Sequence, residues 1–266
     1  MMETGRMKAE AGRVPVVNGY IDGYNFYLPI HDLAEEQRDA GILHLAWCNY
    51  CKLVERLAQQ QFGRCILGMV KLFTAYARDE VRRELSAKGL ERKEHWLEVV
   101  LIEGRGKLHI SYGRWERQGD GEGHGRTKEK LTDVKLAISL VRDACWAQPA
   151  CVPAPAVLAD LEHLYEDHNP PAPFDKALLI SGDKDFLPAA EMVARNARKD
   201  VVICFPYLQD GYKLPLGSKV KTCHVQLEDL KACHLPDEIT VPGRSKILWR
   251  EYVASKGWPH MRRAGG

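Results

Sequence analysis

Four aspartates of this chain stand where predicted strands end or where a helix begins. Asp22 ends a first apolar run, and Asp183 and Asp185 follow another one in "LLISGDKDFLP". Asp133 falls in the first turn of the helix that the apolar spacing of "TDVKLAISLVRDACW" predicts. Two carboxylates about 4 Å apart repel each other by roughly 4 kcal/mol at an effective dielectric of about 20. Four converging acids therefore need a divalent cation or raised pKa values.

These acids favour a hard cation. Carboxylate oxygens without a supporting set of His and Cys residues are typical of magnesium or manganese sites. We predict a site in which Asp22, Asp133, Asp183 and Asp185 surround one or two Mg2+ or Mn2+ ions. The structural alternative is local, because Asp185 or Asp133 could cap a helix and Asp183 could stabilise a turn.

Alternating strands and helices must bring these acids together. The apolar runs predict strands at residues 15–21, 66–77, 107–115, 175–180 and 200–207. Helical spacing predicts helices at 43–61, 78–103, 132–146 and 188–198, and a mobile loop is predicted at 116–130. This alternation indicates a doubly wound α/β fold, with a mostly parallel central sheet covered by helices on both faces. Ligands gather outside the carboxyl ends of such strands, where Asp22 is expected.

Composition sets the domain limits. Residues 1–14 are expected to form a flexible tail, and residues 15–232 the α/β domain. A proline-rich insert at 148–173 interrupts the domain, and a basic and aromatic extension covers 233–266. We expect the insert to provide a surface for specificity, for a protein partner or for a homodimer. The extension suits either a nucleic-acid strand or a packed terminal helix.

Three segments resemble the NYN domain, the LabA-like branch of the PIN-like ribonucleases. They are "YIDGYNFY", "KEKLTDVKLAISLVRDA" and "LLISGDKDFLPAAEMVARNARKDVVIC", in the order and approximate spacing of that family. The resemblance covers about residues 15–232 and implies a PIN-like fold. It also implies that the four aspartates bind a divalent metal and serve the hydrolysis of RNA phosphodiester bonds.

The resemblance gives roles to two more residues and shows one departure. Asn25 matches the family's asparagine after the first acid, which implies an amide that orients a water, a carboxylate or a phosphate. Ser181 matches the serine before the paired acids, and we place it among the substrate-binding residues. Leu131 stands where family members usually carry a glycine, which affects how Asp133 approaches the metal.

Candidate substrate contacts lie next to the acids. Lys130, Lys135 and Lys184 could hold substrate phosphates, although ordinary solvated lysines need no such role. Tyr24 and Tyr27 could stack on unpaired bases, and packing in the core is their alternative. RNA, single-stranded or structured, is the expected partner.

These features predict a metal-dependent ribonuclease, and more specifically an endonuclease. A non-catalytic RNA-binding or regulatory protein on the same fold stays open as the alternative. A metal-dependent phosphatase would usually need a nucleophilic aspartate in a DxD arrangement after the first strand, but this chain has Tyr24 at the second aspartate position.

Composition points to a reducing compartment and away from membranes. No apolar run reaches the roughly 18 to 20 residues that cross a bilayer, and the start of the chain lacks the apolar centre of a secretory signal. The chain is therefore expected in the cytoplasm, with its eight cysteines reduced. Zinc at Cys48 and Cys51, or at the Cys-His pairs 223–224 and 233–234, is less favoured than buried thiols. The net charge of +2 neither demands nor excludes nucleic acid.

Overall fold

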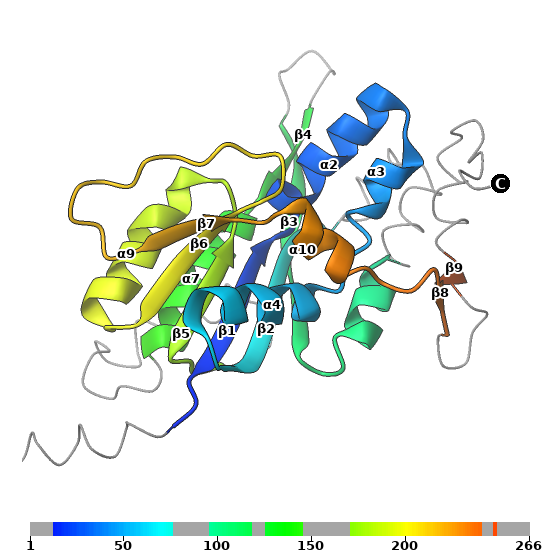
Figure 1. Cartoon of the computed structure of the whole chain (residues 1–266). Helices are drawn as coiled ribbons and strands as arrows, with labels where there is room; N and C mark the ends of the chain where they lie inside the picture. Colours follow the sequence, from blue (N-terminus) through cyan, green and yellow to red (C-terminus); the bar gives the residue numbers. More distant parts are fainter. Residues whose placement is uncertain (1–12, 77–95, 119–125, 146–170, 241–246, 249–266) are drawn as a thin grey trace, which may run out of the picture.

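A computed structural model describes residues 13–76, 96–118, 126–145, 171–240 and 247–248. Within these residues, a seven-stranded sheet has the order β4-β3-β2-β1-β5-β6-β7 (Figure 1). Its strands are β1 (Val16–Asp22), β2 (Ile66–Tyr76), β3 (Leu108–Gln118), β4 (Arg126–Lys130), β5 (Lys176–Ile180), β6 (Asp200–Phe205) and β7 (Lys221–His224). Only β4 runs antiparallel to its neighbour. This arrangement confirms the doubly wound α/β fold.

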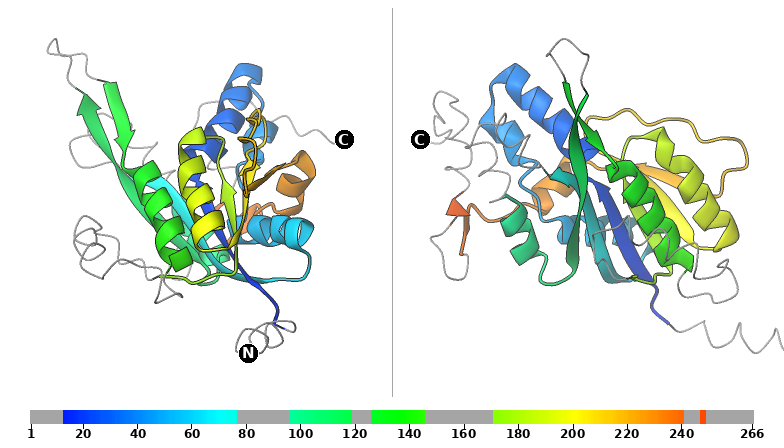
Figure 2. Two further views of the ribbon diagram at one scale, coloured as in Figure 1. Left: turned by 90° about the vertical axis from the view of Figure 1, so that its left-hand side faces the viewer. Right: turned by 180° about the vertical axis from the view of Figure 1, so that it is seen from behind.

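Helices cover both faces of the sheet (Figure 2). One face packs against α7 (Thr132–Cys145) and α9 (Leu187–Asn196), and the other against α4 (Tyr50–Phe62), α10 (Leu227–Ala232) and the helical residues 96–103. The remaining elements are α2 (Gly23–Gln37), α3 (Ala40–His44), the short 3-10 helix η1 (Lys184–Phe186), β8 (Glu238–Ile239) and β9 (Ile247–Leu248). None of the helices in the described ranges is long and apolar enough to span a bilayer.

Burial on both faces explains why the central strands are apolar throughout. Every residue of β1 after Val16 is buried, and so is every residue of β5 after Lys176. The edge strand β7 has no buried residue. Its sequence has no continuous apolar run, so no strand was predicted there. Continuous apolar runs therefore locate the central strands and miss the edges.

Two expectations about local structure were wrong, and one helix was not predicted. The single helix predicted at 43–61 is two helices: α3 ends at His44, and α4 begins at Tyr50 after Asn49, which caps it by accepting a hydrogen bond from the backbone N of Lys52 (3.0 Å). The loop predicted at 116–130 contains the end of β3 and all of β4, which pair with each other. The helix α2 directly after β1 was not predicted. Three predicted segments lie mostly outside the described residues. They are the tail at 1–14, the insert at 148–173 and the extension at 233–266.

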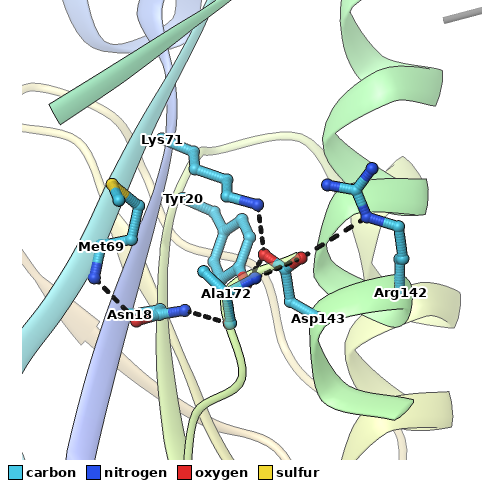
Figure 3. A network of polar contacts seen from close by, with 7 residues as sticks. All are labelled: Asn18, Tyr20, Met69, Lys71, Arg142, Asp143 and Ala172. Atoms are coloured by element: carbon cyan, nitrogen blue, oxygen red, sulfur yellow. Dashed lines mark hydrogen bonds and ion pairs between the residues drawn. The ribbon is translucent and has the colours of Figure 1, made fainter. Parts of the chain in front are cut away.

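A buried polar network fastens α7 to the sheet (Figure 3). Asp143 Oδ2 accepts hydrogen bonds from Tyr20 Oη (2.8 Å) and Lys71 Nζ (2.5 Å), and all three side chains have no exposed surface. Asp143 Oδ1 accepts from the backbone N of Ala172 (3.2 Å) and faces Arg142 Nε at 3.6 Å. Burial, the largest effect, lowers the pKa of Lys71, and it raises the pKa of Tyr20. This network holds the helix that carries Asp133 against β1 and β2.

Candidate functional site

Register places Asp22 beside the segment that carries the paired acids. Ile21 of β1 pairs with Ile180 of β5, so Asp22 and Ser181 come next on two neighbouring parallel strands. The chain leaves β1 toward β2 on one side and returns through β5 on the other, which makes this gap the point where strand order reverses. Ligands of doubly wound sheets bind at such a point.

Three hydrogen bonds hold the Asp22 carboxylate. Oδ1 accepts from the backbone N of Asn25 (3.1 Å), so that Asp22 is the N-cap of α2. Oδ2 accepts from Asn25 Nδ2 (2.6 Å) and from Ser181 Oγ (3.1 Å). Asn25 and Ser181, the two residues given roles by the NYN resemblance, therefore both contact Asp22.

Burial changes the titration of Asp22. The side chain is 2% exposed, and this desolvation, more than any other cause, raises the pKa of Asp22 to about 6. The carboxylate of Asp133 raises the pKa further, while the hydrogen bonds from Asn25 and Ser181 lower it. An ionised Asp22 is thus stabilised by hydrogen bonds from its neighbours, and none of the Lys and Arg residues that the structure describes forms an ion pair with it.

The paired acids continue the same chain of hydrogen bonds. Ser181 Oγ accepts from the backbone N of Asp183 (3.1 Å), and Asp183 Oδ1 accepts from the backbone N of Asp185 (2.9 Å). Asp183 is therefore the N-cap of η1, as the local alternative expected for a turn-forming acid. Asp185 does not cap α9, because the N-cap of that helix is Phe186. Helix capping is thus one role of Asp183. Asp185 is exposed and caps no helix among the described residues.

Asp133 reaches the same group of acids from α7. It is the second residue of that helix, which begins directly after Leu131, whose φ of 72° is in the left-handed region. Asp133 is exposed, yet partial desolvation first, and then the carboxylates of Asp183 and Asp185, raise its pKa. These couplings, together with the coupling between Asp133 and Asp22, bring all four acids into one electrostatic group.

Charge and donor type decide which ion this group fits. Among the described residues, no Lys or Arg forms an ion pair with any of the four acids. In the same part of the chain, no three His, Cys, Asp or Glu side chains are arranged to hold one ion together. Carboxylate oxygens are ligands that Mg2+ takes, one or two at a time beside several waters, so Mg2+ at these acids stays a prediction. In the described ranges the acids do not form a closed site of the zinc type.

The predicted substrate contacts lie in different surroundings. Lys184 is exposed, and its Nζ lies 5.7 Å from the centre of the Tyr212 ring. Lys135 is buried, and its Nζ donates to the backbone O of Tyr112 (2.7 Å), which directs the ammonium to β3. Lys130 ends β4. Tyr24 lies half-buried in the first turn of α2.

The sequence analysis did not predict two residues that contact this site. Gln209 Nε2 donates to the backbone O (3.0 Å) and to Oδ1 (3.2 Å) of Asn25. Tyr212 Oη donates to the backbone O of Asp183 (3.4 Å). Both lie in the connection after β6, which has no periodic pattern. The only local signal is the clustering of Gly and Pro, which marks a loop and says nothing about its contacts.

The zinc alternatives receive no support from the described residues, which contain no suitable group of ligands. Cys48 lies outside α4 and Cys51 within it, and both thiols are buried and free. Burial raises the pKa of both, which keeps them protonated and unreactive.

Comparison with known proteins adds little to this geometry. The chain matches no protein-family model. No curated protein is found to match it either. Among solved structures it is similar to a protein of unknown function, VPA0982 from Vibrio parahaemolyticus RIMD 2210633, at 14% identity and a TM-score of 0.43, over 82% of this chain and 98% of that chain. A likeness at this level carries no argument, so the NYN resemblance stays a prediction from the motifs.

Proposed function

We propose that this protein is a metal-dependent endoribonuclease that hydrolyses RNA phosphodiester bonds. The observation that carries the proposal is the Asp22 carboxylate, which is buried at the point where strand order reverses and is coupled to Asp133. Asp133 is in turn coupled to Asp183 and Asp185. A buried carboxylate without an ion-paired partner is costly unless a cation joins it. The NYN resemblance of the same three segments supports RNA as the substrate, and the free cysteines support a cytoplasmic location.

The four acids, Asn25 and Ser181 would have different roles in this reaction. Asp22, Asp133, Asp183 and Asp185 would hold Mg2+ or Mn2+. When bound, the ion would lower the pKa of a water and neutralise charge on the phosphoryl oxygens. Asn25 and Ser181 would keep the Asp22 carboxylate in one orientation, since they donate to it from two different segments.

The substrate contacts follow from exposure. Lys184 would attract a phosphate of the RNA, because it is exposed and lies between two of the acids in sequence. Lys135 would contribute less directly, since its ammonium is bonded to β3. Tyr24 is half-buried, so it would offer only part of its ring to a base.

The test is cleavage of a mixed set of RNA and DNA substrates with Mg2+, with Mn2+ and with excess chelator. Asp22→Asn and Asp185→Asn should each abolish RNA cleavage while RNA binding persists, because removing negative charge does not weaken phosphate attraction. Asp200→Asn is the matched control, since Asp200 starts β6 at the opposite edge and forms a surface ion pair with Lys176. Cleavage at full rate in chelator, or in both site variants, would refute the proposal. RNA binding without cleavage by the unchanged protein would favour the regulatory alternative.

A further inference from the structure

The connection between β6 and β7 returns to the edge of the sheet that carries Asp22. Its Tyr212 ring packs against Phe205, with 5.0 Å between the ring centres. Its far end is tied to α9, where Arg195 donates to the backbone O of Gly217 (2.8 Å) and Ser218 Oγ donates to Glu191. This segment, residues 206–219, is therefore held in place by contacts that do not involve Asn25.

One side chain of this segment reaches the site. Gln209 Nε2 donates two hydrogen bonds to Asn25, one to the backbone O and one to Oδ1. Its Oε1 lies over Gly182, where an added Cβ would come within 1.6 Å of it. The residue between Ser181 and Asp183 must therefore lack a side chain if Gln209 is to occupy this position.

The hydrogen bond that Asn25 donates to Asp22 and the one that its Oδ1 accepts from Gln209 decide which way the Asn25 amide faces. Asp22 Oδ2 is an acceptor, so Asn25 must present its NH2 group there. Gln209 presents an NH2 group to the other end of the same amide, which only the Asn25 oxygen can accept. A reversed Asn25 amide would set an oxygen against a carboxylate and one NH2 group against another.

We propose that Gln209 is a positioning residue, which fixes the Asn25 amide so that Asn25 holds the Asp22 carboxylate in its working orientation. This inference rests on the proposed function, because it assigns Gln209 a part in the same metal-dependent hydrolysis. Partners that hydrogen-bond directly to a metal ligand, as Asn25 does to Asp22, typically change metal affinity or activity by about 10- to 100-fold when removed. Gln209 acts one residue further away, through Asn25, so the lower end of this range applies to it. The competing role is structural: Gln209 would merely tie the connection to α2.

Two variants remove the same contact in different ways. Gln209→Ala deletes the donor. Gly182→Ala leaves Gln209 in the chain but displaces the end of its flexible side chain, and the backbone of Gly182 is outside the left-handed region, so alanine is tolerated there. Gln61→Ala is the control, since Gln61 is an exposed glutamine on α4.

We expect both variants to lower kcat for RNA cleavage by about 10-fold or more with little change in KM, and the control to change neither. A second readout needs no RNA: the Mn2+ concentration giving half of the metal-induced rise in melting temperature should increase by about 10-fold. In an Asn25→Ala background, Gln209→Ala should cause no further change in either quantity, because its effect passes through Asn25.

The outcomes separate this inference from the proposed function. If the unchanged protein cleaves RNA but Gln209→Ala lowers only the melting temperature, Gln209 is structural and the inference fails while the function stands. Full additivity of Gln209→Ala and Asn25→Ala in kcat would overturn it as well. If the unchanged protein neither cleaves RNA nor is stabilised by Mn2+, the proposed function fails first and this inference falls with it.

Discussion

Asp22 should make the metal-free protein less stable as pH rises. Burial raises the pKa of Asp22 from 3.8 to about 6, a shift of about two units, and each unit corresponds to about 1.4 kcal/mol. The folded protein thus binds the Asp22 proton more tightly than the unfolded chain does. The stabilisation is complete below pH 3.8 and is lost as pH rises through about 6, for a total of about 3 kcal/mol.

Replacing Asp22 by asparagine isolates this contribution. The free energy of unfolding is measured by urea denaturation at several values between about pH 4 and pH 7, in excess chelator. The difference between Asp22→Asn and the unchanged protein should move by about 2.4 kcal/mol in favour of the variant across this range, because part of the total is already lost at pH 4. Hydrogen bonds lost in the variant shift all points equally, so only the pH-dependent part reports the burial of charge. Asp200→Asn should show no comparable change.

Added Mn2+ should shift the difference in stability at neutral pH back in favour of the unchanged protein. The ion stabilises the folded state in which it binds, by about 2.7 kcal/mol at a concentration 100 times its dissociation constant, and Asp22→Asn should lose most of this gain. Parallel pH curves for the unchanged protein and Asp22→Asn would show that Asp22 is not a desolvated carboxylate. The reasoning for a buried, cation-requiring acid would then be wrong.

Two further predictions concern the elements that position the site. Leu131→Gly should raise the free energy of unfolding by about 0.5 to 1 kcal/mol in urea denaturation, because glycine adopts a φ of 72° without strain. Leu131→Val should lower it, and a Gly variant less stable than the unchanged protein would contradict this account. Lys71→Met should lower the free energy of unfolding by about 3 to 5 kcal/mol, since it leaves Asp143 buried without its ion pair. Adding Asp143→Leu to Lys71→Met should recover part of the loss, and strict additivity of the two would argue against a coupled pair.

The main features of the site were predictable because they depend on local patterns. A strand buried on both faces must be apolar at consecutive positions, so the sequence predicted β1 and β5. β1 ends at Asp22, and Asp183 lies three residues after the end of β5. Parallel strands present their carboxyl ends at one edge, which places Asp22 near Asp183 without any knowledge of distances. The spacing of apolar residues along α7 located Asp133 in its first turn in the same way.

Other features were decided by contacts between distant parts of the chain. The break before α4 occurs inside an apolar pattern that continues through it, and Asn49 is held there by the backbone of Cys233. The strand β4 is entirely polar in sequence and is a strand because it pairs with β3. Gln209 contacts Asn25 across 184 positions of sequence. Periodicity and helix capping depend on residues that are neighbours in sequence, so the sequence alone predicts them. The partner of a polar side chain depends on which distant segments the packed sheet brings together.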